Sequence, residues 1–67
     1  METVYDVQQL LKRFGIYIYT GNREADLQLM GDEIKELQDV KMIDDDVFTQ
    51  AMFIIKEDIK MEQRKRK

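Results

Sequence analysis

The side chains best suited to chemistry in this sequence are two tyrosines with cations on either side. Tyr17 and Tyr19 alternate with isoleucines, and Lys12, Arg13 and Arg23 flank them. Aromatic rings can stack on bases while cations hold the phosphate backbone, and neither contact depends strongly on base identity. The group therefore predicts weak binding of single-stranded RNA or DNA without base specificity.

The same tyrosines also have a structural explanation, because tyrosines in a connection often lie flat on helices with the hydroxyl group in water. Charge opposes contact with a polyanion as well. Residues 60–67 hold five cations and one carboxylate, which is a net charge of +4. Because the whole chain has a net charge of −3, residues 1–59 have a net charge of −7. We therefore expect the affinity for nucleic acid to be modest and to fall as salt is added.

Three other charged clusters predict no defined site. Residues 44–46 are three aspartates, but they lack the spacing, glycine and distal glutamate of a calcium loop, and acids are favoured at a helix start. We therefore predict no metal site. The acids of the second helix are interpreted as a solvated face: Asp32, Glu33, Glu36 and Asp39. The basic segment at residues 64–67 adds charge for phosphates without defined geometry.

The sequence contains no histidine and no cysteine. These residues supply many of the nucleophiles, general bases and zinc ligands that work at neutral pH. A chain this short also buries only a thin core, which leaves no room for a deep closed site. We expect a protein that is not an enzyme and that takes neither a cofactor nor a small-molecule substrate.

Location follows from two further features of the sequence. The first residues are acidic and polar, unlike the basic and then apolar start of a signal peptide. No apolar run approaches the length that crosses a bilayer. The sequence therefore predicts a cytoplasmic protein with no membrane partner.

Three stretches repeat apolar residues every three or four positions, which is the spacing of one helix face. The first follows a capping box predicted at Thr3 and Asp6 and ends near Phe14, where Gly15 can adopt the left-handed conformation. The second follows the predicted N-cap Asn22 and runs to about residue 41. The apolar positions are Val4, Val7, Leu11 and Phe14 in the first stretch, and Leu27, Met30, Ile34 and Leu37 in the second.

The third stretch, from Asp44 to Gln63, carries two adjoining apolar seams and is predicted to be the central helix, with Ile55 buried by both partners. The seams are Phe48, Met52, Ile55 and Ile59, and beside them Val47, Ala51 and Ile54. The short connection before it predicts that the second and third helices are antiparallel. Gly31, inside the second helix, indicates either that the backbone at this position is closely approached or that the helix is bent.

Residues 16–20 alternate isoleucine and tyrosine, but no second stretch of this kind exists to pair with them. A lone strand is unstable. We therefore predict an extended connection with Ile16 and Ile18 on the helices and the tyrosines outward. The predicted fold is an all-α three-helix bundle with an extended connection between helices one and two. It forms one helical domain over residues 1–63, followed by the basic tail at residues 64–67.

The most particular part of the sequence is Arg13-Phe14-Gly15-Ile16-Tyr17, followed by Thr20-Gly21-Asn22-Arg23. Together with the acidic second helix and the Phe-, Met- and Ile-rich third helix, this order resembles the YqgQ-like family of small, uncharacterised bacterial proteins over nearly the whole chain. The resemblance implies a small helical bundle from bacteria of the Gram-positive type. By structural analogy it also implies binding of single-stranded nucleic acid.

Two apolar residues fall outside the seams, Leu29 in the second helix and Phe53 in the third. Lying together, they would form an exposed patch of the kind that binds a partner. They therefore leave open a second function, that of a protein-interaction adaptor or a self-associating helical module.

Overall fold

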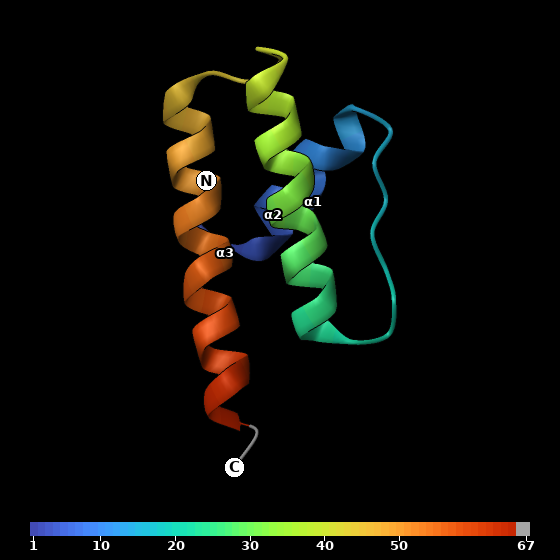
Figure 1. Ribbon diagram of the computed structural model, residues 1–67, viewed down its shortest axis with the longest axis vertical. Coiled ribbons are helices and arrows are strands. Elements are labelled where there is room, and N and C mark those ends of the chain that lie inside the picture. Colours follow the sequence, from blue (N-terminus) through green and yellow to red (C-terminus); the bar gives the residue numbers. More distant parts are fainter. Residues whose placement is uncertain (66–67) are drawn as a thin grey trace.

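The computed structural model describes residues 1–65, and these residues form three helices with no strand. The helices are α1 (Val4–Arg13), α2 (Arg23–Asp39) and α3 (Asp45–Lys65). Figure 1 shows α2 and α3 side by side, with the shorter α1 behind them and α3 extending past the beginning of α2. The all-α three-helix bundle predicted from the sequence is confirmed.

The start of α1 is fixed by the predicted capping box. The Asp6 amide donates to Thr3 Oγ1 at 3.4 Å, and the Thr3 amide donates to Asp6 Oδ2 at 3.1 Å. The Glu2 amide donates to the same carboxylate at 2.8 Å. These backbone donors, Glu2 first and then Thr3, lower the pKa of Asp6 because they favour its charged form.

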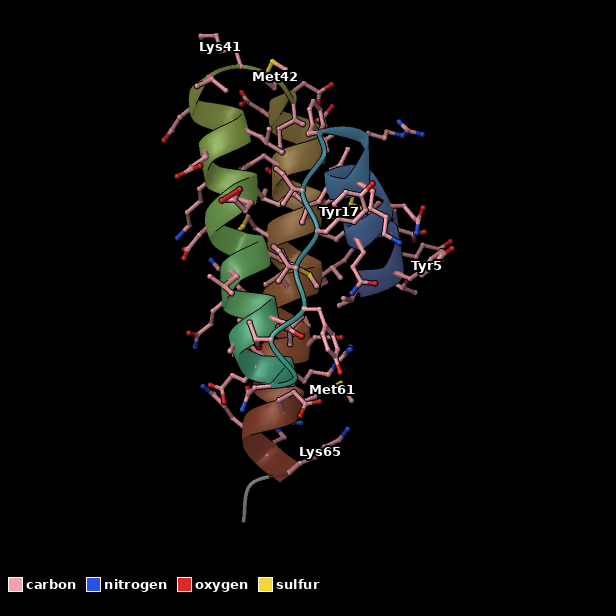
Figure 2. The ribbon with its side chains drawn as sticks, turned by 90° about the vertical axis from the view of Figure 1, so that its right-hand side faces the viewer. Tyr5, Tyr17, Lys41, Met42, Met61 and Lys65 are labelled. Atoms are coloured by element: carbon pink, nitrogen blue, oxygen red, sulfur yellow. The ribbon has the colours of Figure 1, made fainter. Side chains whose placement is uncertain are left out.

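The end of α1 turns the chain back on itself through Gly15, which adopts a φ of +75°. The Gly15 amide donates to the Lys12 carbonyl and the Ile16 amide donates to the Leu11 carbonyl, both at 3.0 Å. This pair of bonds is a Schellman motif, the common way to stop a helix at a left-handed residue. As a result, the segment at residues 16–22, here called the connector, runs back beside α1 (Figure 2).

α2 begins at the predicted cap, where Asn22 Oδ1 accepts from the Ala25 amide at 2.9 Å. It ends in a second Schellman motif, with Lys41 in the left-handed position at a φ of 60°. Asp44 Oδ1 then accepts from the Val47 amide at 2.9 Å and caps α3. The observed helices begin and end within two residues of the predicted bounds.

The core is apolar, and α2 contributes the largest share of it. The buried side chains are Val4, Val7 and Leu11 of α1, Leu27, Met30, Ile34 and Leu37 of α2, and Ala51 and Ile55 of α3. The other seam residues of α3 are only partly buried. Both earlier helices pack against α3, as predicted, but α1 packs against α2 as well. The prediction of α3 as the single central helix is corrected accordingly: α2 and α3 form the main pair, and α1 packs against both.

Gly31 lies in the contact between α2 and α3. A Cβ atom at this position would lie 3.7 Å from Met52 Cε and 3.8 Å from Ile55 Cγ2, which is ordinary van der Waals contact with side chains. The backbone at Gly31 is therefore not approached so closely that a Cβ atom would be excluded. None of the helices in residues 1–65 is both long and apolar enough to cross a membrane.

Candidate nucleic-acid interface

The connector adopts the predicted extended form. Ile16 and Ile18 are half-buried and pack against the core, whereas 74 % of Tyr17 and 88 % of Tyr19 is exposed. Thr20 anchors the far end, because its amide and its hydroxyl both donate to Asp26 Oδ1 at 2.7 Å. The connector therefore presents two rings on one side while its isoleucines hold it to the helices.

A groove of about 360 Å³ lies between α1 and the connector. Three residues of α1 line one side of the groove, Gln8, Leu11 and Lys12, because their spacing places them on one face of that helix. Leu11 and Met30, each only 2 % exposed, belong to the core beneath it. The groove is lined by Gln8, Leu11, Lys12, Ile16, Tyr17, Ile18, Tyr19 and Met30.

The two tyrosines stand on the same side of an extended segment, two residues apart. At about 3.3 Å per residue, their backbone positions are about 6.6 Å apart. Figure 2 shows Tyr17 on the side of the connector next to α1, and Tyr5 on the opposite side of that helix. Both groove rings are therefore accessible to flat aromatic ligands, whereas Tyr5 lines a neighbouring hollow that shares only Gln8 with the groove.

Of the three cations predicted to hold phosphates, only Lys12 lines the groove. It is exposed and makes no ion pair with any residue in the described range 1–65. Arg13 is the next residue, about 100° further around the helix. It lines a separate hollow with Met1, Glu2, Asp6, Gln9 and Leu10.

Arg23 serves the fold instead of the groove. Its Nη2 atom lies 2.9 Å from Asp58 Oδ2 and its Nε atom lies 3.5 Å from Glu62 Oε1, so it ties the start of α2 to α3. The structure thus brings together Lys12, Tyr17 and Tyr19 and leaves Arg13 and Arg23 outside. Arg23 was predicted from its closeness in sequence to the tyrosines, and its carboxylate partners are more than thirty residues away.

Sequence reasoning missed Gln8, which also lines the groove. The available signal was its position four residues before Lys12, which places both side chains on one face of a helix. The amide of Gln8 forms no hydrogen bond to another residue in the part of the chain that the structure describes. The main-chain amides of Tyr17, Ile18 and Tyr19 are likewise unpaired within residues 1–65.

The other charged clusters are placed as follows. Asp44 caps α3, and Asp45 Oδ1 accepts from Gln38 Nε2 at 3.0 Å. The acids of α2 lie toward solvent, with Asp32, Glu36 and Asp39 exposed and Glu33 half-buried. Arg64 and Lys65 of the predicted basic tail continue α3, and residues 66–67 lie outside the described residues.

Leu29 and Phe53 are 43 % and 65 % exposed, but they do not form one patch. At about 100° per residue, each stands about 160° from a residue of the α2–α3 contact, Gly31 in one helix and Ile55 in the other. The two side chains therefore point away from that contact on opposite sides. A shared apolar docking surface made by these two residues is absent.

Comparison with known proteins supports the resemblance noted above. The family model described as YqgQ-like matches residues 1–61. The chain is 42 % identical over 59 residues to the uncharacterized protein YqgQ of Bacillus subtilis (strain 168), an alignment that covers 88 % of this chain and 83 % of that protein. The chain belongs to the YqgQ-like family.

Proposed function

We propose that this protein is a small, non-catalytic binding protein that holds single-stranded nucleic acid, RNA or DNA, in the groove between α1 and the connector. The observation that carries the proposal is the pair of exposed rings at Tyr17 and Tyr19, which the core does not need. Lys12 supplies a cation beside them. A ring pair with an adjacent cation is the arrangement with which proteins hold unpaired bases.

The magnitudes favour a modest affinity. A stacked base contributes about 1–3 kcal/mol, and each phosphate contact to a single strand adds about −0.7 to the slope of log affinity against log salt. With Lys12 as the groove cation and a net charge of −7 on residues 1–59, the rings have to supply most of the binding free energy. The basic residues after Gln63 add long-range attraction.

The test is a titration of a fluorescent single-stranded oligonucleotide at low salt. Wild type is compared with the Tyr17→Ala/Tyr19→Ala double variant, with Tyr5→Ala, and with a chain truncated after Gln63. We expect the double variant to bind at least about tenfold more weakly, because two stacking surfaces are lost. Tyr5→Ala, which removes an exposed ring outside the groove, should bind like the wild type.

Two results of this titration would count against the proposal. Loss of binding only on truncation would mean that the basic end acts as a nonspecific polycation. Absence of wild-type binding at low salt would end the nucleic-acid proposal and favour a protein partner.

A second candidate function, docking of an extended peptide of a partner protein, is favoured by one observation. The unpaired amides of Tyr17, Ile18 and Tyr19 belong to an extended segment, and such an edge can take up another strand. Sedimentation of the pure protein at several concentrations separates this candidate from self-association. A strict monomer at high concentration would exclude self-association.

A cytoplasmic location remains a prediction from the sequence.

A further inference from the structure

A hollow of about 280 Å³ lies between α2 and α3, and it is here called the α2–α3 hollow. Its lining residues all belong to these two helices, and none of them lines the groove beside the tyrosines. The buried residues Gly31 and Ile55 and the half-buried residues Met52 and Ile59 form an apolar floor. The α2–α3 hollow is therefore a second surface, separate from the candidate nucleic-acid interface.

Gly31 is a residue of this floor that packing does not require. Glycine weakens the interior of a helix relative to alanine. A Cβ atom at this position would make only ordinary contacts, 3.7 Å to Met52 Cε and 3.8 Å to Ile55 Cγ2. What the glycine provides is space beside Met52, whose unbranched side chain is flexible and adapts to an inserted neighbour. The floor can therefore take up an apolar side chain of another molecule.

Two lysines line the α2–α3 hollow above this floor. Lys35 of α2 and Lys56 of α3 are exposed, and neither makes an ion pair with any residue in the described range 1–65. Asp32 lines the hollow with them, so two cations and one carboxylate give a net charge of +1. This sign is opposite to that of residues 1–59, which have a net charge of −7. The hollow therefore favours a partner that carries carboxylates.

The two lysines lie on either side of Gly31 along the hollow. Gly31 is opposite Met52 and Ile55, and α2 and α3 run in opposite directions (Figure 1). Lys35 is four residues beyond Gly31 along α2, a rise of about 6 Å. Lys56 is about 4 Å beyond the midpoint of Met52 and Ile55 along α3. Because the helices are antiparallel, the two rises add, and the lysine backbones are about 10 Å apart along the helix axes.

We infer that the α2–α3 hollow docks an amphipathic helix of a partner protein, with two carboxylates seven residues apart and an apolar side chain between them. The carboxylates pair with Lys35 and Lys56, and the apolar side chain enters the floor at Gly31. The inference goes beyond the proposed function, because it concerns a different surface and does not depend on binding of nucleic acid.

The spacing of the lysines selects a helical partner. Seven residues of α-helix rise about 10.5 Å, and a residue three or four positions after the first carboxylate lies on the same face. In an extended peptide, residues on one face are about 6.6 or 13 Å apart, which fits the separation of Lys35 and Lys56 less well. An amphipathic helix in an apolar groove is a recurring mode of protein recognition.

The experiment uses a fluorescent synthetic helical peptide, based on alanine and glutamine, that carries two glutamates seven residues apart and a leucine between them. Two control peptides replace both glutamates by glutamine or the leucine by alanine. Each peptide is titrated at low salt against wild type, Lys35→Gln/Lys56→Gln and Lys41→Gln/Lys60→Gln. The last variant is the matched control, because it removes two exposed lysines that do not line the hollow. Circular dichroism and thermal unfolding establish that both variants fold like the wild type.

We expect wild type and Lys41→Gln/Lys60→Gln to bind the glutamate–leucine peptide alike. Lys35→Gln/Lys56→Gln should bind it about fivefold more weakly, the effect of losing two exposed ion pairs. Wild type should bind each control peptide at least about fivefold more weakly, because one lacks both ion pairs and the other lacks the buried leucine.

Three results would overturn the inference and leave the proposed function standing. The first is absence of wild-type binding to the glutamate–leucine peptide, or equal binding to a control peptide. The second is an affinity that Lys35→Gln/Lys56→Gln retains or that both double variants lose equally, which would show a response to net charge alone. The third is self-association of wild type in sedimentation that Lys35→Gln/Lys56→Gln abolishes, which would assign the hollow to a second copy of this chain.

Discussion

The contact between α2 and α3 and the groove between α1 and the connector are built from similar helices but use their polar groups differently. Along α2 and α3, Arg23 is bound to Asp58 and Glu62, and the Gln38 amide is bound to Asp45. In the groove, Lys12 and Gln8 have no partner among the described residues. These ion pairs and this hydrogen bond hold the helices of the first region together, whereas Lys12 and Gln8 in the second region are available for a ligand.

The difference separates stability from binding. Burial of apolar side chains supplies most of the stability of a small domain. The largest share of these buried side chains lies on α2. The groove rings are largely exposed, so removing them changes little in the fold. Substitutions in the two regions should therefore have opposite profiles: loss of stability in one region and loss of binding in the other.

The largest effect is expected at the centre of the α2–α3 contact. Ile55 is 1 % exposed, so Ile55→Asp would place an unpaired carboxylate in the core and should abolish cooperative unfolding. The measurement is thermal or urea unfolding followed by circular dichroism. Phe53→Asp is the matched control on the same helix, because Phe53 is 65 % exposed, and we expect a change within about 0.5 kcal/mol. An Ile55→Asp protein that unfolds like the wild type would contradict the architecture.

The next effect concerns the turns that end α1 and α2. Gly15→Ala forces a side chain into the left-handed conformation and should lower the free energy of unfolding by about 1 kcal/mol. Lys41→Gly relieves the same strain in the other Schellman motif, and we expect the free energy of unfolding to rise by about 0.5 kcal/mol. The gain is small because glycine also increases the conformational entropy of the unfolded chain. Urea unfolding measures both changes. A stabilised Gly15→Ala protein would show that the left-handed turn does not hold the connector.

A pair of cation substitutions tests the contrast directly. Arg23→Gln removes two partly exposed ion pairs and should lower the free energy of unfolding by about 0.5 kcal/mol without changing oligonucleotide affinity. Lys12→Gln should leave unfolding unchanged and reduce the slope of log affinity against log salt by about 0.7. Arg13→Gln is the matched control for Lys12. If instead Arg23→Gln reduced the salt slope and Lys12→Gln lowered the free energy of unfolding, the phosphate contact would lie at Arg23.

The smallest effect is the pH dependence due to Asp6. Its pKa is lower in the folded protein than its ordinary value because the amides of Glu2 and Thr3 favour the carboxylate. Its stabilising contribution is therefore present above the ordinary pKa and is lost as the pH falls through the folded pKa. Asp6→Asn should flatten the decline of the melting temperature at acidic pH, and Asp32→Asn, a substitution outside the cap, should not. Identical acid profiles for wild type and Asp6→Asn would exclude this contribution.

The sequence predicts the local features of this fold well because each depends on neighbouring residues. The capping box at Thr3, the stop at Gly15, the cap at Asn22 and the alternation of the connector all involve contacts within a few positions. Apolar spacing identified the faces of the helices. It did not reveal that α2 carries more of the core than α3, because spacing records direction and not the depth to which a neighbour covers a residue.

The candidate site was only partly predictable for the same reason. Tyr17, Tyr19 and Lys12 meet because the chain reverses at Gly15 and brings residues close in sequence together. Arg23 lies outside the groove because its carboxylate partners come from the far end of α3. Nothing near Arg23 in the sequence indicates those partners.

The most direct test of the account is to map the amide chemical shifts of the protein by NMR during titration with a short single-stranded oligonucleotide at low salt. We expect the largest changes at Gln8, Lys12 and residues 16–20, with little change at Arg23 and in the α2–α3 contact. The changes should disappear in the Tyr17→Ala/Tyr19→Ala variant. Changes confined to the basic end of α3, or no changes at any amide, would contradict the assignment of the groove as the binding surface.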